Sequence, residues 1–198
     1  MKLPTNKTQF ILASTSRARR QILENYNIKA QYVSHDVDEE KEICKNKKLQ
    51  EKLAAFLARK KIDSIQDQHK KSLIIGSDQI IICENILINK PITEEEAIRN
   101  LLILQNNIHT LISAICVLTP GGKYVLFEDT AKVQMKKICK LDIEKYVKQN
   151  KDIVYETSGS YKIENDKLKC ITKVEGDNET ILGFPIKKAL PLLRSYIT

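Results

Sequence analysis

Residues 10–20 read FILASTSRARR, and this stretch decides the class of fold. Its apolar start, Phe10 to Ala13, predicts a short buried strand. The polar and basic residues that follow predict a helix over residues 16–26, with Ser14 or Ser16 as its N-cap. A strand that runs directly into a helix is a building unit of α/β folds. We therefore expect the rest of the chain to alternate in the same way.

The downstream pattern continues this alternation. Further strands are predicted over residues 29–34, 73–75, 80–82, 108–118 and 124–135, and further helices over 47–66, 93–104, 141–149 and 184–197. Thr93 with Glu96 three residues later forms a capping box. Residues 35–46 are polar and acidic and predict a loop, Glu84-Asn85 predicts a hairpin turn, and residues 153–173 predict a mixture of loop and strand. Because no repeat or linker divides the chain, a single domain over residues 1–198 is expected.

Composition places the chain among globular proteins, with 42% apolar and 29% charged residues. The most apolar stretch, Leu73 to Ile88, is interrupted by polar residues and falls short of the ~20 apolar residues of a membrane helix. The apolar run over residues 10–13 is too short for a signal peptide. Five scattered cysteines without a CxxC pair argue against disulfides and zinc. We expect a cytoplasmic protein with reduced thiols and no membrane contact.

The formal net charge of +8 favours an anionic partner, either a nucleotide or a nucleic acid. The chain has no tryptophan, no interleaved basic and aromatic residues and no helix-turn-helix pattern, which argues against nucleic acid. It also lacks a Walker A motif, a Rossmann fingerprint and a G-x-S-x-G elbow. With only six glycines, phosphate binding has to rely on side chains.

Two segments suggest phosphate or metal chemistry. In LASTSRARR, the N-terminus of the predicted helix, the Ser14 hydroxyl and the Arg19 and Arg20 guanidinium groups are suited to phosphate oxygens. The alternative without a ligand is a capped helix with an exposed basic face. In GSDQ, Asp78 follows a buried strand at a position where α/β sheets place ligands, so it is suited to a Mg²⁺ ion or an attacking water. A simple turn aspartate is the alternative.

Two further segments are weaker signals. Lys90 precedes a proline in NKP and is a candidate phosphate contact, although a solvated lysine is the simpler interpretation. In SGSYKIE the small residues allow close approach of the backbone to a ligand, and Glu164 is suited to the edge of a nucleobase. An ordinary loop is the alternative there.

Together and in this order, these segments resemble the Maf family of nucleotide pyrophosphatases over nearly the whole chain. The resemblance rests on eight pieces of sequence: LASTSRARR, Asp38-Glu39 in VDEE, Leu57-Ala58-Arg59-Lys60-Lys61, GSDQ, NKP, Tyr146-Val147, SGSYKIE and EGDNETILGFP. It implies a two-lobed Maf/ITPase-like α/β fold, in which a long mixed sheet is flanked by helices and a central cleft lies between the lobes.

The resemblance also implies roles for individual residues. The triphosphate is expected to contact Ser14, Arg19, Arg20, Lys61 and Lys90. Glu39 and Asp78 are expected to hold Mg²⁺ or Mn²⁺, with Asp78 as the general base. Gln79 and Glu164 are expected to read the base, and Ala18 to shape its pocket. The helix register leaves Lys60 as an alternative to Lys61. The expected partners are a nucleoside triphosphate substrate and a second copy of the chain in a homodimer.

Gln79 and Glu164 resemble the family branch that acts on 7-methyl-GTP, whose positively charged base favours a nearby carboxylate. A pyrimidine branch acting on dTTP or UTP is the alternative enzyme, and a septum-formation or nucleic-acid-binding regulator is the alternative outside enzymes. The chain departs from the family pattern at Arg17, Ala18, Asn89, Ser158 and Asn165. Of these, the small Ala18 bears most on base selectivity.

Overall fold

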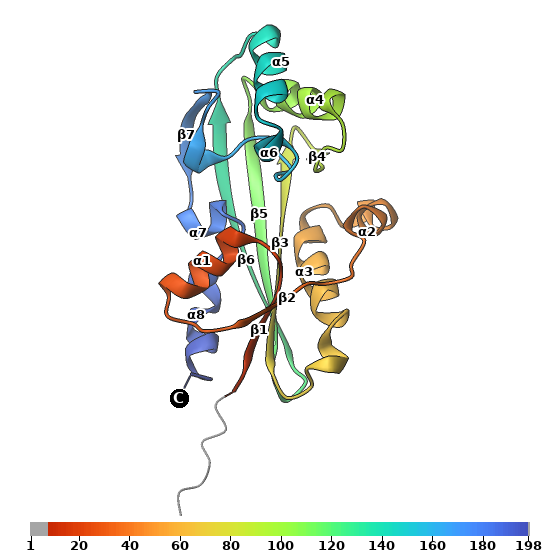
Figure 1. Cartoon of the computed structure of the whole chain (residues 1–198), viewed down its shortest axis with the longest axis vertical. Coiled ribbons are helices and arrows are strands. Elements are labelled where there is room, and N and C mark those ends of the chain that lie inside the picture. The colour runs from red at the N-terminus through yellow and green to blue at the C-terminus, as the bar shows by residue number, and fades with distance from the viewer. Residues whose placement is uncertain (1–7, 198) are drawn as a thin grey trace, which may run out of the picture. The chain divides into compact units, whose positions relative to one another are not determined.

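The computed structural model describes residues 8–197, except the side chain of Lys47 (Figure 1). Seven strands form one sheet in the order β2-β1-β3-β5-β6-β7, and β4 pairs with β3 off this path. β1 pairs in parallel with β2 and β3, whereas the β3–β4 and β6–β7 pairs are antiparallel. This mixed sheet with flanking helices confirms the expected α/β class.

The chain divides into two compact units. The first comprises the residues up to Gln79, Ser113–Asp129 and the residues from Asp177 onward, and the second comprises Ile80–Ile112 and Thr130–Gly176. Strands β3 (Leu73–Cys83), β5 (Ile108–Leu118) and β6 (Tyr124–Met135) contribute residues to both. The two units correspond to the two expected lobes. The single domain and the central cleft stay predictions.

The first unit is organised around β1 (Phe10–Ala13), which lies between β2 (Gln31–Val33) and β3. Helices α1 (Arg17–Asn25) and α8 (Ile186–Arg194) pack their apolar residues on this part of the sheet in one buried cluster. Figure 1 shows α3 (Leu53–Asp63) on the opposite face. α3 lies very close to β3, because a Cβ atom at Gly76 would come within 2.1 Å of the Ala58 carbonyl oxygen. Gly76 therefore sets the spacing between this helix and the strand.

The second unit begins with a hairpin. Glu84 and Asn85 both have positive φ, as a type I′ turn requires, and they join β3 to β4 (Ile86–Ile88). Thr93 caps α4 (Glu94–Leu104) by accepting a hydrogen bond from the Glu96 amide, as expected from the capping box. α4 packs against α5 (Lys140–Gln149), which is followed by α6 (Lys151–Val154), the 3₁₀ helix η3 (Ile163–Asn165) and β7 (Ile171–Glu175).

Three sequence predictions were wrong in detail. The predicted loop over residues 35–46 contains α2 (Glu39–Lys45), which Asp38 caps and which buries no residue, so it lacks the apolar period that would have revealed it. The predicted helix over 47–66 is divided into η1 (Lys47–Lys52), α3 and η2 (Gln66–Gln68), and Gln50 interrupts η1 with a φ of 40°. The extended segments predicted over residues 73–75 and 80–82 are not separated by a turn at Gly76-Ser77-Asp78 but form one continuous strand, β3.

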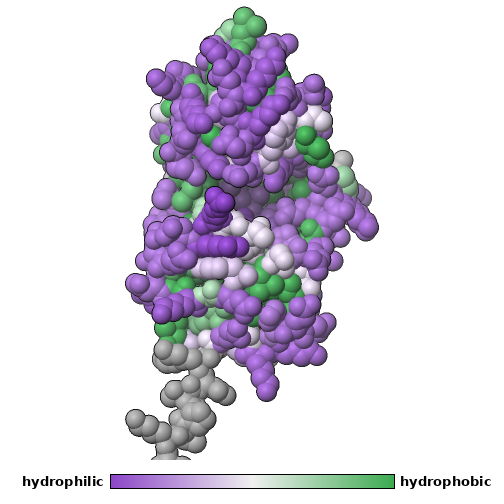
Figure 2. Space-filling model, in the orientation of Figure 1, coloured by the Kyte–Doolittle hydropathy of each residue, from purple (hydrophilic) through white to green (hydrophobic). Residues whose placement is uncertain are grey.

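The surface and the cysteines agree with the composition. All five cysteines are free thiols. Among residues 8–197, no helix is long and apolar enough to cross a membrane. The face drawn in Figure 2 is mostly hydrophilic, with small separate hydrophobic areas.

Candidate active site

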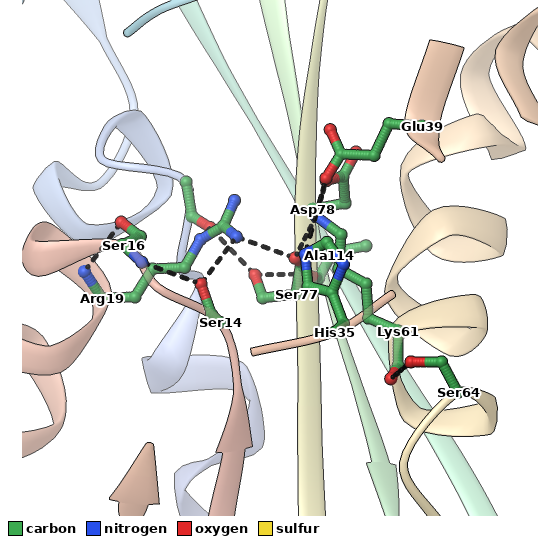
Figure 3. Close-up of polar contacts among 11 residues, drawn as sticks. Ser14, Ser16, Arg19, His35, Glu39, Lys61, Ser64, Ser77, Asp78 and Ala114 are labelled. Atoms are coloured by element: carbon green, nitrogen blue, oxygen red, sulfur yellow. Dashed lines mark hydrogen bonds and ion pairs between the residues drawn. The ribbon is translucent and has the colours of Figure 1, made fainter. Parts of the chain in front are cut away.

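A buried lysine joins two carboxylates at the centre of the site. Lys61 lies on α3 with 3% of its side chain exposed, and its Nζ lies 2.5 Å from Asp78 Oδ1 and 2.7 Å from Glu39 Oε1. Asp78 lies within β3, and Glu39 is the first residue of α2. Figure 3 shows these three side chains converging from separate elements. The neighbouring Lys60 instead points to Glu42 at the surface, so Lys61 is the lysine that contacts both carboxylates.

Local geometry explains this convergence. Gly76 and Asp78 are two positions apart on β3 and therefore face the same side of the sheet. Ala58 and Lys61 are three positions apart on α3 and share one face of the helix. Gly76 of β3 packs against Ala58 of α3, so the next residues on the same faces, Asp78 on the strand and Lys61 on the helix, also meet. Asp78 thus lies inside a continuous strand, which corrects the expectation that it follows the strand's end.

Burial and neighbouring charges act in opposite directions on the two carboxyl groups. Burial raises the pKa of Asp78, and the Glu39 charge adds to this, although Lys61 and Arg19 oppose it. Burial would also raise the pKa of Glu39, but Lys61, His35 and Arg19 together lower it. We infer that Asp78 is the stronger base of the two.

His35 adjoins this cluster, and the sequence interpretation missed it. Its Nε2 lies 3.7 Å from Glu39 Oε1, and burial together with the Lys61 charge lowers its pKa, so that the ring is neutral at pH 7. Its Nδ1 is buried and has no hydrogen-bond partner in the described part of the chain. The only sequence signal was its position four residues before Glu39, in a segment interpreted as a loop.

A serine–arginine corner adjoins the carboxylates. Arg19 donates from Nη1 to the Ser77 carbonyl at 2.8 Å and to Ser14 Oγ at 3.5 Å, and from Nε to the Gly183 carbonyl at 3.1 Å. Ser16, not Ser14, is the N-cap of α1. Burial lowers the pKa of Arg19, although the charges of Asp78 and Glu39 raise it. Ala13, the last residue of β1, pairs with Gly76, so Ser14 directly after β1 and Ser77 within β3 are the next residues of the two neighbouring segments.

Gln79 is held by hydrogen bonds within the first unit. Its Nε2 donates to Ser113 Oγ at 2.9 Å and to the carbonyl oxygens of Thr180 and Ile181 at 3.0 Å. Ser77 Oγ similarly hydrogen-bonds the Gly183 carbonyl at 2.9 Å. These contacts fix the segment that contains α7 (Asn178–Ile181) and the following turn. Base reading by Gln79 stays a prediction.

The remaining predicted residues form no hydrogen bond or ion pair with this cluster among the described residues, or belong to the other unit. Ala18 is half-buried on α1, and the Arg20 guanidinium lies over the Tyr32 ring, 4.7 Å from its centroid. Lys90 and Glu164 are exposed residues of the second unit. The structure therefore brings together six predicted residues, all in the first unit: Ser14, Arg19, Glu39, Lys61, Asp78 and Gln79. The participation of Lys90 and Glu164 stays a prediction.

The carboxylates fit a divalent cation of the Mg²⁺ type. Each uses one oxygen on Lys61, and no residue of the described chain hydrogen-bonds to Asp78 Oδ2 or Glu39 Oε2. No group of three or more His, Cys, Asp or Glu side chains among residues 8–197 is arranged to hold a metal. Two carboxylates suit Mg²⁺ or Mn²⁺, since Mg²⁺ is usually bound by one or two carboxylates, waters and substrate phosphates.

Comparison with known proteins places the chain in a family. It is 32% identical over 189 residues to a nucleoside triphosphate pyrophosphatase of Pelagibacter ubique, covering 94% of this chain and 97% of the relative. It is 38% identical over 182 residues to a 7-methyl-GTP pyrophosphatase of Bdellovibrio bacteriovorus, covering 90% and 92%. A dTTP/UTP pyrophosphatase of Geobacillus sp. is 29% identical over 182 residues, covering 92% and 95%. A family model described as Maf-like protein matches residues 9–196, and the chain therefore belongs to the Maf family.

Proposed function

We propose that this chain is a nucleoside triphosphate pyrophosphatase, which hydrolyses its substrate to a nucleoside monophosphate and pyrophosphate. The observation that carries the proposal is the buried Lys61 between Asp78 and Glu39, with Arg19 beside it. A triphosphate carries about four negative charges and needs several cations to bind it away from water. The names of the related enzymes support the same reaction.

Arg19 and Ser14 are the proposed phosphate ligands of the first unit. The Nη2 group of Arg19 forms no hydrogen bond with any described residue, so it is free to donate to a phosphate oxygen. Helix α1 begins directly after Ser16, and its N-terminal amides add a partial positive charge. Arg20, Lys61 and Lys90 are the proposed additional cations.

Asp78 is the proposed general base. As a water oxygen attacks the α-phosphorus, the water proton passes to the Asp78 carboxylate. The bond from the α-phosphorus to the bridging oxygen breaks, and its electron pair leaves with pyrophosphate. The raised pKa of Asp78 makes this carboxylate a stronger base than an exposed aspartate. Glu39 and Asp78 are the proposed ligands of Mg²⁺ or Mn²⁺, which when bound neutralises part of the phosphate charge.

The preferred base is a finer part of the proposal. Gln79, Glu164 and the 38% identical relative favour 7-methyl-GTP, and Ala18 is the proposed wall of the base pocket. The pyrimidine relatives favour dTTP or UTP as the second candidate. Pyrophosphate release from 7-methyl-GTP, GTP, dTTP and UTP with Mg²⁺ or Mn²⁺ separates the two. In Glu164→Gln a preference for 7-methyl-GTP over GTP should weaken, and an unchanged ranking would count against base reading by Glu164.

The test of the catalytic assignment is Asp78→Asn. Loss of a general base should lower kcat by about 10²–10⁴-fold, while thermal unfolding confirms that the variant is folded. Asp67→Asn removes an exposed aspartate of the same unit, 90% exposed at its side chain, and should leave kcat unchanged. Near-normal turnover in Asp78→Asn would reject the role of Asp78.

A further inference from the structure

The second unit contains a cavity of about 550 Å³ that involves no residue of the candidate active site. The loop between β6 and α5, α5 along its length to Asn150, and residues 167–168 form its walls. Four lysines line it, at positions 136, 137, 145 and 167, together with one acidic residue, Asp142. The stretch from Lys132 to Lys151 contains seven lysines and two acidic residues, so this region is more basic than the chain as a whole.

The positive charge of the cavity is not neutralised within the protein. Among the described residues, none of the four lysines lies within ion-pair distance of a carboxylate, whereas the nearby Lys140 and Lys151 pair with Glu144 and Glu94. A concave surface with an excess of charge of one sign, here four lysines against Asp142, concentrates the electrostatic field and attracts counter-ions. The cavity is therefore suited to an anion.

A buried amide fixes one of these lysines in the cavity wall. Asn150 is 7% exposed, accepts a hydrogen bond from Lys167 Nζ at 2.7 Å and donates to the Tyr146 carbonyl at 2.8 Å. The N-terminus of α5 opens into the same cavity, and its N-cap, Cys139, forms no capping hydrogen bond through its side chain. The amides of the first helical turn thus add to the positive potential.

We propose that this cavity binds a small phosphate-bearing molecule of nucleotide size. Its volume falls within the range of small-molecule sites, and lysines bind phosphate groups as point charges. The aromatic ring in its lining, that of Tyr146, belongs to a buried residue, so recognition rests on the phosphate groups rather than on stacking. The site is separate from the proposed pyrophosphatase centre and does not depend on that activity.

Cys139 provides a local reporter, since it is exposed and lines the cavity. The rate at which iodoacetamide alkylates Cys139 is followed by mass spectrometry on the full-length protein in metal-free buffer. The rate is compared with and without inorganic pyrophosphate or AMP. At a ligand concentration ten times Kd, bound ligand should slow the reaction of Cys139 about tenfold. The exposed Cys44 in the first unit is the reference thiol. If pyrophosphate protects Cys139, phosphate groups are sufficient for binding. If AMP protects Cys139 and pyrophosphate does not, the ligand is a nucleotide. Either outcome supports the site.

Two matched double variants test the lysines. Lys137→Glu with Lys145→Glu should abolish the protection of Cys139. Lys132→Glu with Lys148→Glu makes the same change in net charge at exposed positions outside the cavity and should retain it. The proposal is overturned if neither anion protects Cys139 at millimolar concentration. It is equally overturned if both double variants lose protection alike.

Discussion

Replacement of Lys61 by methionine should destabilise the protein strongly, because the lysine is the partner of a buried carboxylate. The substitution keeps the length of the side chain and removes the ammonium that lies 2.5 Å from Asp78 and 2.7 Å from Glu39. Asp78, with 8% of its side chain exposed, would then be buried with Arg19 as its remaining nearby cation. Removing one partner of a buried ion pair costs about 3–5 kcal/mol.

For a chain of this length, that cost lowers Tm by roughly 6–20 °C. The assay is thermal and urea-induced unfolding of the wild-type protein and Lys61→Met side by side. Lys60→Met is the matched control, because Lys60 is its neighbour on α3 but forms a 3.8 Å surface pair with Glu42. An exposed pair of this kind contributes at most about 1 kcal/mol.

The loss should also depend on pH. Burial raises the pKa of Asp78 in the folded state, and removal of Lys61 raises it further. Since an unfolded aspartate titrates near pH ~3.9, the folded state then holds the proton more tightly. Stability is therefore lost as the pH rises from that value through the folded pKa. The penalty of Lys61→Met should be largest at neutral pH and should shrink toward pH ~4.

A double variant completes the test. Lys61→Met combined with Asp78→Asn removes the charge from both partners and should regain much of the stability that Lys61→Met loses, without regaining activity. The reasoning is refuted if Lys61→Met is no less stable than Lys60→Met. A penalty that does not change with pH would refute the assignment of the effect to the buried Asp78 charge.

Two further predictions concern residues outside this ion pair. Burial lowers the pKa of His109 to about 4, so between pH ~4 and pH ~6.5 the unfolded state binds the proton more tightly than the folded state. The free energy of unfolding should therefore rise by about 3 kcal/mol over this range. His109→Gln should flatten this rise, as measured by urea unfolding. Gly76→Ala places a Cβ 2.1 Å from the Ala58 carbonyl oxygen and must displace α3, which should cost about 1–3 kcal/mol and lower turnover. In the control Gly121→Ala, the added Cβ meets its nearest atom at 3.9 Å, so neither stability nor turnover should change. Equal losses of stability and turnover in the two variants would contradict the role of Gly76.

Local pattern was sufficient for much of the fold. The strands over residues 10–13, 108–118 and 124–135 and the capped helix after Thr93 were predicted from apolar runs and a capping box, and the structure confirms them. Helix α2 was missed because it buries no residue. The strand predicted over residues 80–82 is part of β3, but the unbroken passage of β3 through Gly76-Ser77-Asp78 was missed because Gly-Ser-Asp resembles a turn. Only the packing of α3 shows that this glycine permits close approach of a helix.

The sequence by itself determined the α/β alternation, the family and the residue types suited to phosphate and a divalent cation, since these follow from periodicity and motif order. Tertiary structure alone decided that Lys61 rather than Lys60 faces Asp78 and that His35 adjoins Glu39. It also decided that the Gln79 amide is occupied by backbone and hydroxyl oxygens. The physical reason is that burial and partner distance depend on how α3 packs on β3, and no local pattern specifies that packing.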